Sequence, residues 1–204
     1  MNNRNLLSIK NNIILKKTKN PMDLMDWCVD GIPFSNEEYK NYILNDIFSS
    51  VNITKSDILL DLGCGCGYLL KSIEDKCKYS MGVEISKALI EKKVCKSEII
   101  ENDIISFRTE HKFSKIICYS VALLFPNMEY LCNVIEKIIC LLKPGGEALI
   151  GDIQFKKHHF YLIPNWEQLF NTLSNNKNIT FRLENQSSYK RKLNSRLNLK
   201  ISKF

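Results

Sequence analysis

The stretch that most constrains this chain runs from Ile58 to Tyr68 and reads ILLDLGCGCGY. Its first half is aliphatic apart from Asp61, which is typical of a strand buried on both faces. Three glycines at alternate positions, Gly63, Gly65 and Gly67, then end the run. Glycine allows a tight turn and lets a ligand approach the backbone closely. The pattern therefore predicts a buried parallel strand that turns directly into a helix, with a ligand at the turn.

Three interpretations of this loop compete. A dinucleotide-binding loop has the spacing G-x-G-x-x-G, with an acidic residue about 20 positions later. Here the spacing is G-x-G-x-G, Tyr68 follows the last glycine, and Asp61 precedes the first. This combination resembles motif I of the class I S-adenosylmethionine-dependent methyltransferases. A glycine-rich turn that arises by chance is the third interpretation, and features further along the chain make it weaker.

Strand and helix patterns alternate after the loop, as in parallel strands joined by crossover helices. Predicted helices include one capped by Ser35, one over 66–77, one that begins after Ser86 and carries Leu89, Ile90 and Val94, and two over 127–142 and 165–173. The predicted strands are 58–62, 79–83, 98–100, 115–119, 147–151, 179–183 and 197–204. The last two, joined by the polar residues 185–194, indicate an antiparallel hairpin at the sheet edge. With 204 residues and 45% hydrophobic side chains, one domain is expected.

This order of elements resembles the methyltransferase sheet, with motif support from Asp46 to Gly151 and by element order alone beyond. The resemblance implies an α/β fold: a Rossmann-like, doubly wound, seven-stranded sheet that is mostly parallel, with an antiparallel C-terminal β-hairpin. Lys143-Pro-Gly-Gly, a helix stop before the fifth strand, is a further point of resemblance. We expect residues 21–204 to form the single methyltransferase domain, and residues 1–20 to be a flexible basic arm.

The apolar segment from Pro21 to Pro33 precedes the first helix and contains Trp27. Two interpretations of it stay open, an N-terminal helical lid over the ligand and ordinary core packing. The first 20 residues carry five basic and no acidic side chains, and residues 177–204 carry eight basic against one acidic. Since the net charge is +7, the residues between are acidic overall. Solvated basic ends therefore fit better than a nucleic-acid site, which favours a basic face around the site itself.

Acidic residues stand at the ends of three successive predicted strands. Asp61 belongs to the first, Glu84 ends the second, and Asp103 follows the third. In an open α/β sheet, ligands bind at the carboxyl ends of the strands where the strand order reverses. A carboxylate there can accept both hydroxyls of a ribose. A single solvated loop acid would be ordinary, but three at successive strand ends indicate a site.

The resemblance implies the cofactor S-adenosyl-L-methionine and a role for each matching position. Glu84 would accept the ribose hydroxyls, Asp103 the adenine amino group, and the backbone amide of Ile104 would meet the ring. The full set of cofactor-binding residues that it implies is Asp61, Gly63, Cys64, Gly65, Gly67, Glu84, Ile85, Asp103, Ile104 and Tyr119.

Methyl transfer asks the protein to align the acceptor and to remove a proton where the acceptor is a hydroxyl. Residues 119–126, after the fourth strand, and 152–164, after the fifth, are expected to line the acceptor. His158 lies in the second segment and is the candidate base, because imidazole titrates near neutrality. The signature Asn/Asp-Pro-Pro-Tyr/Phe of enzymes that methylate nucleic-acid amino groups is absent from the first segment. The double-glutamate loop of the protein arginine enzymes is also absent.

The eight cysteines are scattered, without a CxxC pair or a Cys/His spacing that would bind zinc. We expect no metal, and free thiols that behave as small apolar residues in a reducing cytosol. No run approaches the length of a membrane span and the start does not resemble a signal peptide, so a cytoplasmic protein without a membrane partner is expected.

The sequence thus predicts methyl transfer from S-adenosyl-L-methionine to an O or N atom of a small molecule, for example a sugar or a metabolite. The alternatives are an RNA or protein methyltransferase that uses the basic C-terminal hairpin, and a non-catalytic subunit that binds the cofactor. The acceptor and the oligomeric state are left open.

Overall fold

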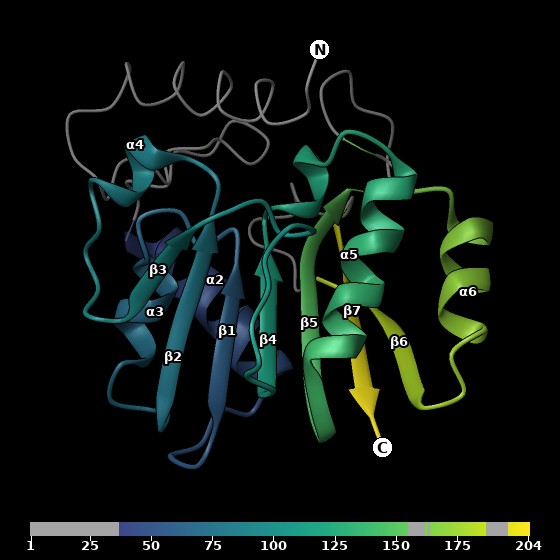
Figure 1. Cartoon of the computed structure of the whole chain (residues 1–204), viewed down its shortest axis with the longest axis horizontal. Helices are drawn as coiled ribbons and strands as arrows, with labels where there is room; N and C mark the ends of the chain where they lie inside the picture. The colour runs from purple at the N-terminus through teal and green to yellow at the C-terminus, as the bar shows by residue number, and fades with distance from the viewer. Residues whose placement is uncertain (1–36, 155–161, 163, 187–195) are drawn as a thin grey trace.

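The computed structural model describes residues 37–154, 162, 164–186 and 196–204, and Figure 1 draws the others as a grey trace. The predicted arm (1–20), the predicted lid and His158 therefore lie outside the described residues. Seven strands form one sheet in the order β3-β2-β1-β4-β5-β7-β6. Their bounds are β1 Ile58–Leu62, β2 Tyr79–Glu84, β3 Glu98–Glu101, β4 Phe113–Tyr119, β5 Leu142–Gln154, β6 Ile179–Asn185 and β7 Arg196–Lys203.

The sheet has the predicted topology. Strands β1 to β5 are parallel, while β7 runs antiparallel to both β5 and β6. The chain moves from β1 through β2 to β3 toward one edge and then returns to place β4 on the other side of β1. The strand order therefore reverses between β1 and β4, and the carboxyl ends of these strands form the edge where α/β sheets bind ligands.

Helices cover both faces of the sheet, as a doubly wound fold requires. Figure 1 shows α5 (Met128–Leu141) in front of the sheet and α2 (Glu37–Ser50) behind it. Alternate residues of β4 pack into the two hydrophobic cores, one on each face of the sheet. Ile116 and Cys118 join the core that contains α5 and α6 (Trp166–Ser174), and Ile117 joins the core under α2 and α3 (Tyr68–Ile73). Burial on both faces explains why these strands are so apolar.

Two helices are shorter than predicted. Helix α3 begins at Tyr68 rather than at Cys66, because Gly67 has φ 83° and a left-handed residue cannot lie within the helix. Helix α4 spans only Lys87–Ile90 and buries no side chain. The reason is a tertiary contact: the chain leaves the helix, and the N–H of Val94 donates to the carbonyl of Cys66 at 2.9 Å.

Strand β5 is longer than predicted, because the turn predicted at Lys143-Pro-Gly-Gly lies within the strand and not before it. Phe113 of β4 pairs with Leu142, and the next pair is Lys115 with Glu147. Lys143-Pro-Gly-Gly thus forms an irregularity within the strand, where Gly145 takes φ 76°.

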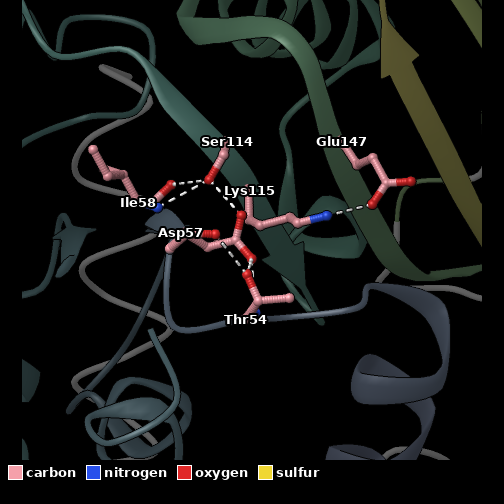
Figure 2. A network of polar contacts seen from close by, with 7 residues as sticks. Thr54, Asp57, Ile58, Ser114, Lys115 and Glu147 are labelled. Atoms are coloured by element: carbon pink, nitrogen blue, oxygen red, sulfur yellow. Dashed lines mark hydrogen bonds and ion pairs between the residues drawn. The ribbon is translucent and has the colours of Figure 1, made fainter. Parts of the chain in front are cut away.

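The amino ends of β1, β4 and β5 are joined by a polar network (Figure 2). Asp57 accepts hydrogen bonds from the N–H of Thr54 at 2.7 Å, from its hydroxyl at 2.9 Å, and from the hydroxyl of Ser114 at 2.7 Å. Next to it, Lys115 forms an ion pair with Glu147 at 2.5 Å. Burial opposes the ionisation of Asp57, but these hydrogen bonds outweigh it and hold its pKa below the usual value.

Among the residues that the structure describes, none of the helices has the length and apolar character needed to span a bilayer.

Candidate cofactor site

The glycine loop is fastened to the end of β2. The N–H groups of Gly63 and Cys64 both donate to the carbonyl of Val83, at 2.7 and 3.2 Å. The N–H of Gly67 then donates to the carbonyl of Cys64, at 2.9 Å, and closes the turn into α3. The loop therefore lies on the carboxyl edge of β1 and β2, where the sequence places it.

The three loop glycines have positive φ but serve different purposes. A Cβ on Gly63 would lie 2.6 Å from the side chain of Val121, and one on Gly67 would lie 2.4 Å from Sγ of Cys95. Both glycines are therefore needed for close packing. Gly65 has φ 58°, and beyond its chain neighbours no atom of the described residues lies within 4 Å of the position that a Cβ would take. The open space of the loop is thus above Gly65.

Glu84 lies against this loop and is 5% exposed. Its Oε2 accepts the N–H of Gly65 at 2.9 Å, and its Oε1 accepts those of Ile85 and Ser86 at 2.9 and 2.8 Å. Burial raises the pKa of Glu84, although these hydrogen bonds work in the opposite direction. Glu84 therefore fixes the central glycine while one face of Oε2 remains able to accept another donor.

Asp61 lies on the neighbouring strand, paired in register with Gly82 of β2, and is 4% exposed. Burial, followed by the negative charge of Glu84, raises the pKa of Asp61 to about 8. Two buried carboxyl groups close together disfavour double ionisation unless a positive charge joins them. This pair makes the edge a site suited to a cation.

Asp103 lies beside Glu84, because the N–H of Asn102 donates to the carbonyl of Glu84 at 2.9 Å. Its Oδ1 accepts the N–H groups of Ile105 and Ser106 at 2.9 and 3.3 Å, and its Oδ2 accepts the hydroxyl of Tyr130 at 2.8 Å. The side chain of the intervening Ile104 is buried in the core. The structure thus brings Asp61, Glu84 and Asp103 to one edge of the sheet.

Tyr119 points toward α2 and the C-terminal strands rather than along the glycine loop. Its hydroxyl donates to Asp46 at 2.7 Å and accepts from Gln186, and Asn198 also donates to Asp46, at 2.8 Å. Burial and the nearby carboxylates of Asp46 and Asp152 raise the pKa of Tyr119 well above its usual value. This network was not predicted from the sequence. The signal for it was Asp46, an acid between Ile43 and Ile47 on the buried face of an amphipathic helix.

The ends of β4 and β5 carry a second feature that the sequence did not indicate. Ser120 and Asp152 have φ 58° and 61°, and are the non-glycine residues with positive φ within the described ranges. The Ser120 hydroxyl donates to Oδ2 of Asp152 at 2.8 Å, and Oδ1 lies 3.5 Å from the guanidinium of Arg196. Such left-handed residues cluster at functional sites. They lie at the start of both segments that were expected to line the acceptor.

The loop thiols are packing groups. Cys64 Sγ lies over Gly82, where a Cβ would come within 2.4 Å of it. Burial raises the pKa of both Cys64 and Cys66, so both stay protonated at neutral pH. No group of three or more Cys, His, Asp or Glu side chains with metal-binding geometry occurs within the part of the chain that the structure describes.

The structure therefore gathers nine of the ten predicted cofactor-binding positions around one loop and one sheet edge, with Tyr119 facing a neighbouring polar network. They lie near the end of β1 and in the glycine loop, at the end of β2 and directly after it, and in the turn after β3: Asp61, Gly63, Cys64, Gly65, Gly67, Glu84, Ile85, Asp103 and Ile104. Their roles in binding remain proposals.

Comparison with known proteins agrees with this geometry. Residues 59–146 match the family model of a methyltransferase domain. A probable cobalt-precorrin-6B C(15)-methyltransferase of Methanococcus vannielii is 35% identical over 63 residues, which are 31% of this chain and 33% of that protein. Chondramide synthase of Chondromyces crocatus is 31% identical over 108 residues, 47% of this chain and 3% of that protein. The chain thus spans a third or less of the length of these relatives.

Solved structures share the fold over nearly the whole chain. The N-methyltransferase NodS of Bradyrhizobium japonicum, solved with S-adenosyl-L-homocysteine, has a TM-score of 0.71 at 16% identity, covering 97% of this chain and 98% of that one. Magnesium protoporphyrin IX methyltransferase of Synechocystis, solved with bound S-adenosylmethionine, has a TM-score of 0.68 at 12% identity, covering 100% and 98%. Residues 59–146 thus match the methyltransferase-domain family, and the chain has the Rossmann-like fold of solved S-adenosylmethionine-dependent methyltransferases.

Proposed function

We propose that this chain transfers a methyl group from S-adenosyl-L-methionine to an oxygen or nitrogen atom of a small-molecule acceptor. The observation that carries the proposal is the meeting of an open glycine loop with two buried carboxyl groups, Asp61 and Glu84. The loop leaves space above Gly65, and the carboxyl groups supply acceptors and negative charge. The methyl donor has a matching chemistry, with ribose hydroxyls, an ammonium group and a sulfonium.

The contacts of the acidic residues at this edge of the sheet support a separate role in cofactor binding for each of them. Glu84 would accept a ribose hydroxyl at the acceptor position of Oε2 that the N–H of Gly65 leaves open. Asp61 would ionise as a positive ligand binds, since its raised pKa reflects burial next to another acid. Asp103 and the backbone of Ile104 would meet the adenine. When bound, S-adenosyl-L-methionine supplies an activated methyl group, so the protein has to align the acceptor and exclude water.

The acceptor is expected at the carboxyl ends of β4 and β5, next to Ser120 and Asp152. His158 stays a prediction for the base. Three observations favour a small molecule: the missing Asn/Asp-Pro-Pro-Tyr/Phe motif, the acidic middle of the chain, and the names of two fold neighbours. One is the magnesium protoporphyrin IX methyltransferase described above. The other is a phosphoethanolamine N-methyltransferase of Haemonchus contortus, with a TM-score of 0.76 at 11% identity over 98% of this chain and 49% of that one.

Calorimetric titration with S-adenosyl-L-methionine and S-adenosyl-L-homocysteine tests the cofactor proposal. The wild-type protein is expected to bind both, and Glu84→Gln to bind them at least about tenfold more weakly, as expected on losing a hydrogen bond to a charged group. Glu101→Gln is the matched control, because Glu101 pairs with Glu84 in register but is exposed. Absence of binding by the wild-type protein would overturn the proposal.

Transfer of a labelled methyl group then tests the acceptor. The labelled donor is incubated with the protein and either a metabolite extract or total RNA. Label in a small molecule is expected. Label in RNA, with binding that weakens steeply as salt rises, would instead support a nucleic-acid methyltransferase. Binding without transfer to either pool would favour a cofactor-binding subunit.

A further inference from the structure

Tyr130 reaches the turn after β3 from a separate element, helix α5. It lies in the first turn of α5, where its N–H donates to Asn127, the N-cap of the helix. Its hydroxyl crosses to the loop after β3 and donates to Oδ2 of Asp103 at 2.8 Å. Tyr130 is 9% exposed and Asp103 8%, so this hydrogen bond is sheltered from water.

Asp103 is held on both of its oxygens. Oδ1 accepts the N–H groups of Ile105 and Ser106, and Oδ2 accepts Tyr130. An ionised carboxylate has about four acceptor positions. Contacts among the described residues fill three of them, so one position remains, and it is on the oxygen that Tyr130 orients.

We propose that Tyr130 is a positioning residue that sets the base preference of the cofactor site by orienting Asp103. The inference rests on the proposed function, in which Asp103 accepts the amino group of adenine. An amino group donates and matches the remaining acceptor position. The 6-oxo group of hypoxanthine can only accept hydrogen bonds. An ionised Asp103 has no hydrogen to donate, so the two oxygens cannot form a hydrogen bond.

A tyrosine suits this role because it donates without adding charge. Burial, the hydrogen bond to Asp103 and the charge of that carboxylate raise the pKa of Tyr130, so its hydroxyl stays protonated and can only be a donor toward Asp103. Its ring is fixed by Phe125, whose centroid lies 4.9 Å away at a tilt of 53°. A lysine at this place would neutralise the carboxylate, whereas the phenol leaves its charge available to the ligand.

The test measures affinities for two ligands that differ at one position, S-adenosyl-L-homocysteine and S-inosyl-L-homocysteine. Calorimetry gives both dissociation constants for the wild-type protein and for Tyr130→Phe, Asp103→Asn and the double variant. The wild-type protein is expected to prefer the adenosyl ligand by about 100-fold or more, because a site built to accept a hydrogen bond rejects a ligand without the donor. In Tyr130→Phe this preference is expected to fall about tenfold, the effect of one hydrogen bond to a charged group.

Asp103→Asn tests the contact between Asp103 and adenine independently of the role of Tyr130. An amide can present a donor to the 6-oxo group, so the preference is expected to fall at least as far as in Tyr130→Phe. In the double variant the second substitution is expected to add little, since both residues act through one contact. Tyr79→Phe is the control: Tyr79 is 39% exposed at the start of β2, on the opposite edge, and its loss of a hydroxyl is expected to change neither affinity.

Tyr130→Phe keeps the ring and its packing, so the variant is expected to fold, and its thermal midpoint checks this. An equal loss of affinity for both ligands in Tyr130→Phe would show that Tyr130 only packs, and would overturn the inference alone. An unchanged preference in Asp103→Asn would overturn the adenine contact, and the inference with it. Failure of the wild-type protein to bind the adenosyl ligand would overturn the proposed function itself.

Discussion

Two buried aspartates four positions apart show how differently the two edges of the sheet are built. Asp57 stands immediately before β1 and is 7% exposed, and Asp61 is the fourth residue of β1 and is 4% exposed. At the amino edge, Thr54 and Ser114 donate to Asp57 and keep its pKa low. At the carboxyl edge, none of the described residues donates a hydrogen bond to the Asp61 carboxyl group, and Glu84 adds a second acid beside it.

This difference distinguishes an acid that stabilises the fold from an acid at a candidate ligand site. A buried acid that its own protein satisfies with donors stabilises the fold. A buried acid that lies next to another acid costs stability, and such perturbed groups concentrate where a ligand binds. Burial alone would have classed Asp57 and Asp61 together. Their neighbours distinguish them: the donors around Asp57 stabilise the fold, whereas the acid beside Asp61 fits the positive ligand of the proposed function.

The largest expected effect concerns the pH dependence of stability. For Asp61 the folded pKa is raised to about 8 from an unfolded value of 3.8. Between these values the folded state holds a proton that the unfolded state has lost, so the free energy of unfolding falls as pH rises, by at most about 1.4 kcal/mol per pH unit. Asp61→Asn is expected to remove this loss and to be more stable than the wild-type protein at pH 8, measured by denaturant unfolding without ligand.

Asp57→Asn is the matched variant, and its expected effect on stability has the opposite sign to that of Asp61→Asn. A lowered pKa gives stability that is present above the unfolded value of 3.8 and is lost as pH falls through the folded value. The variant is therefore expected to be less stable than the wild-type protein at neutral pH, with a difference that shrinks in acid. Parallel pH profiles for the two variants would contradict the comparison.

A pair of glycines on the two edges gives the next largest effect. Gly65 and Gly145 have φ 58° and 76°, and in the described part of the chain only their own neighbours come within 4 Å of the place where a Cβ would stand. An alanine at either position is expected to cost a similar ~1–2 kcal/mol in stability through left-handed backbone strain. Only Gly65→Ala is expected to weaken binding of S-adenosyl-L-homocysteine, by about 100-fold, because its methyl group occupies the open space of the loop.

Thermal unfolding and calorimetric titration of both glycine variants measure these two quantities. Similar falls in the midpoint with very different affinities are expected. Equal affinities would mean that the ligand does not lie above Gly65, and would place the cofactor elsewhere on the edge.

Much of the fold and the cofactor edge could be predicted, because the signals are local. An aliphatic run, a glycine turn and an acid at a strand end are each readable within a few residues, and parallel strands bring their ends together. The sheet order, the antiparallel hairpin and the neighbourhood of Asp61, Glu84 and Asp103 follow from such signals.

What could not be predicted depends on contacts between distant segments. The hydrogen bond from Tyr130 to Asp103 joins residues 27 positions apart, and that from Asn198 to Asp46 joins residues 152 apart. The length of helix α4 was predicted wrongly for the same reason. Helix α4 ends early because Val94 pairs with Cys66, a tertiary hydrogen bond that overrides the local helical pattern.

The smallest expected effect compares two serines at the ends of β4. Ser114 donates to Asp57 and accepts the N–H of Ile58 at 2.9 Å, so Ser114→Ala is expected to lose about 1–2 kcal/mol of stability. Ser120→Gly loses the hydrogen bond to Asp152 but relaxes a backbone with φ 58°, so its stability is expected to stay within about 0.5 kcal/mol. Denaturant unfolding measures both. A loss in Ser120→Gly as large as that in Ser114→Ala would mean that Ser120 holds the fold together as Ser114 does, and the carboxyl edge of β4 would then resemble its amino edge.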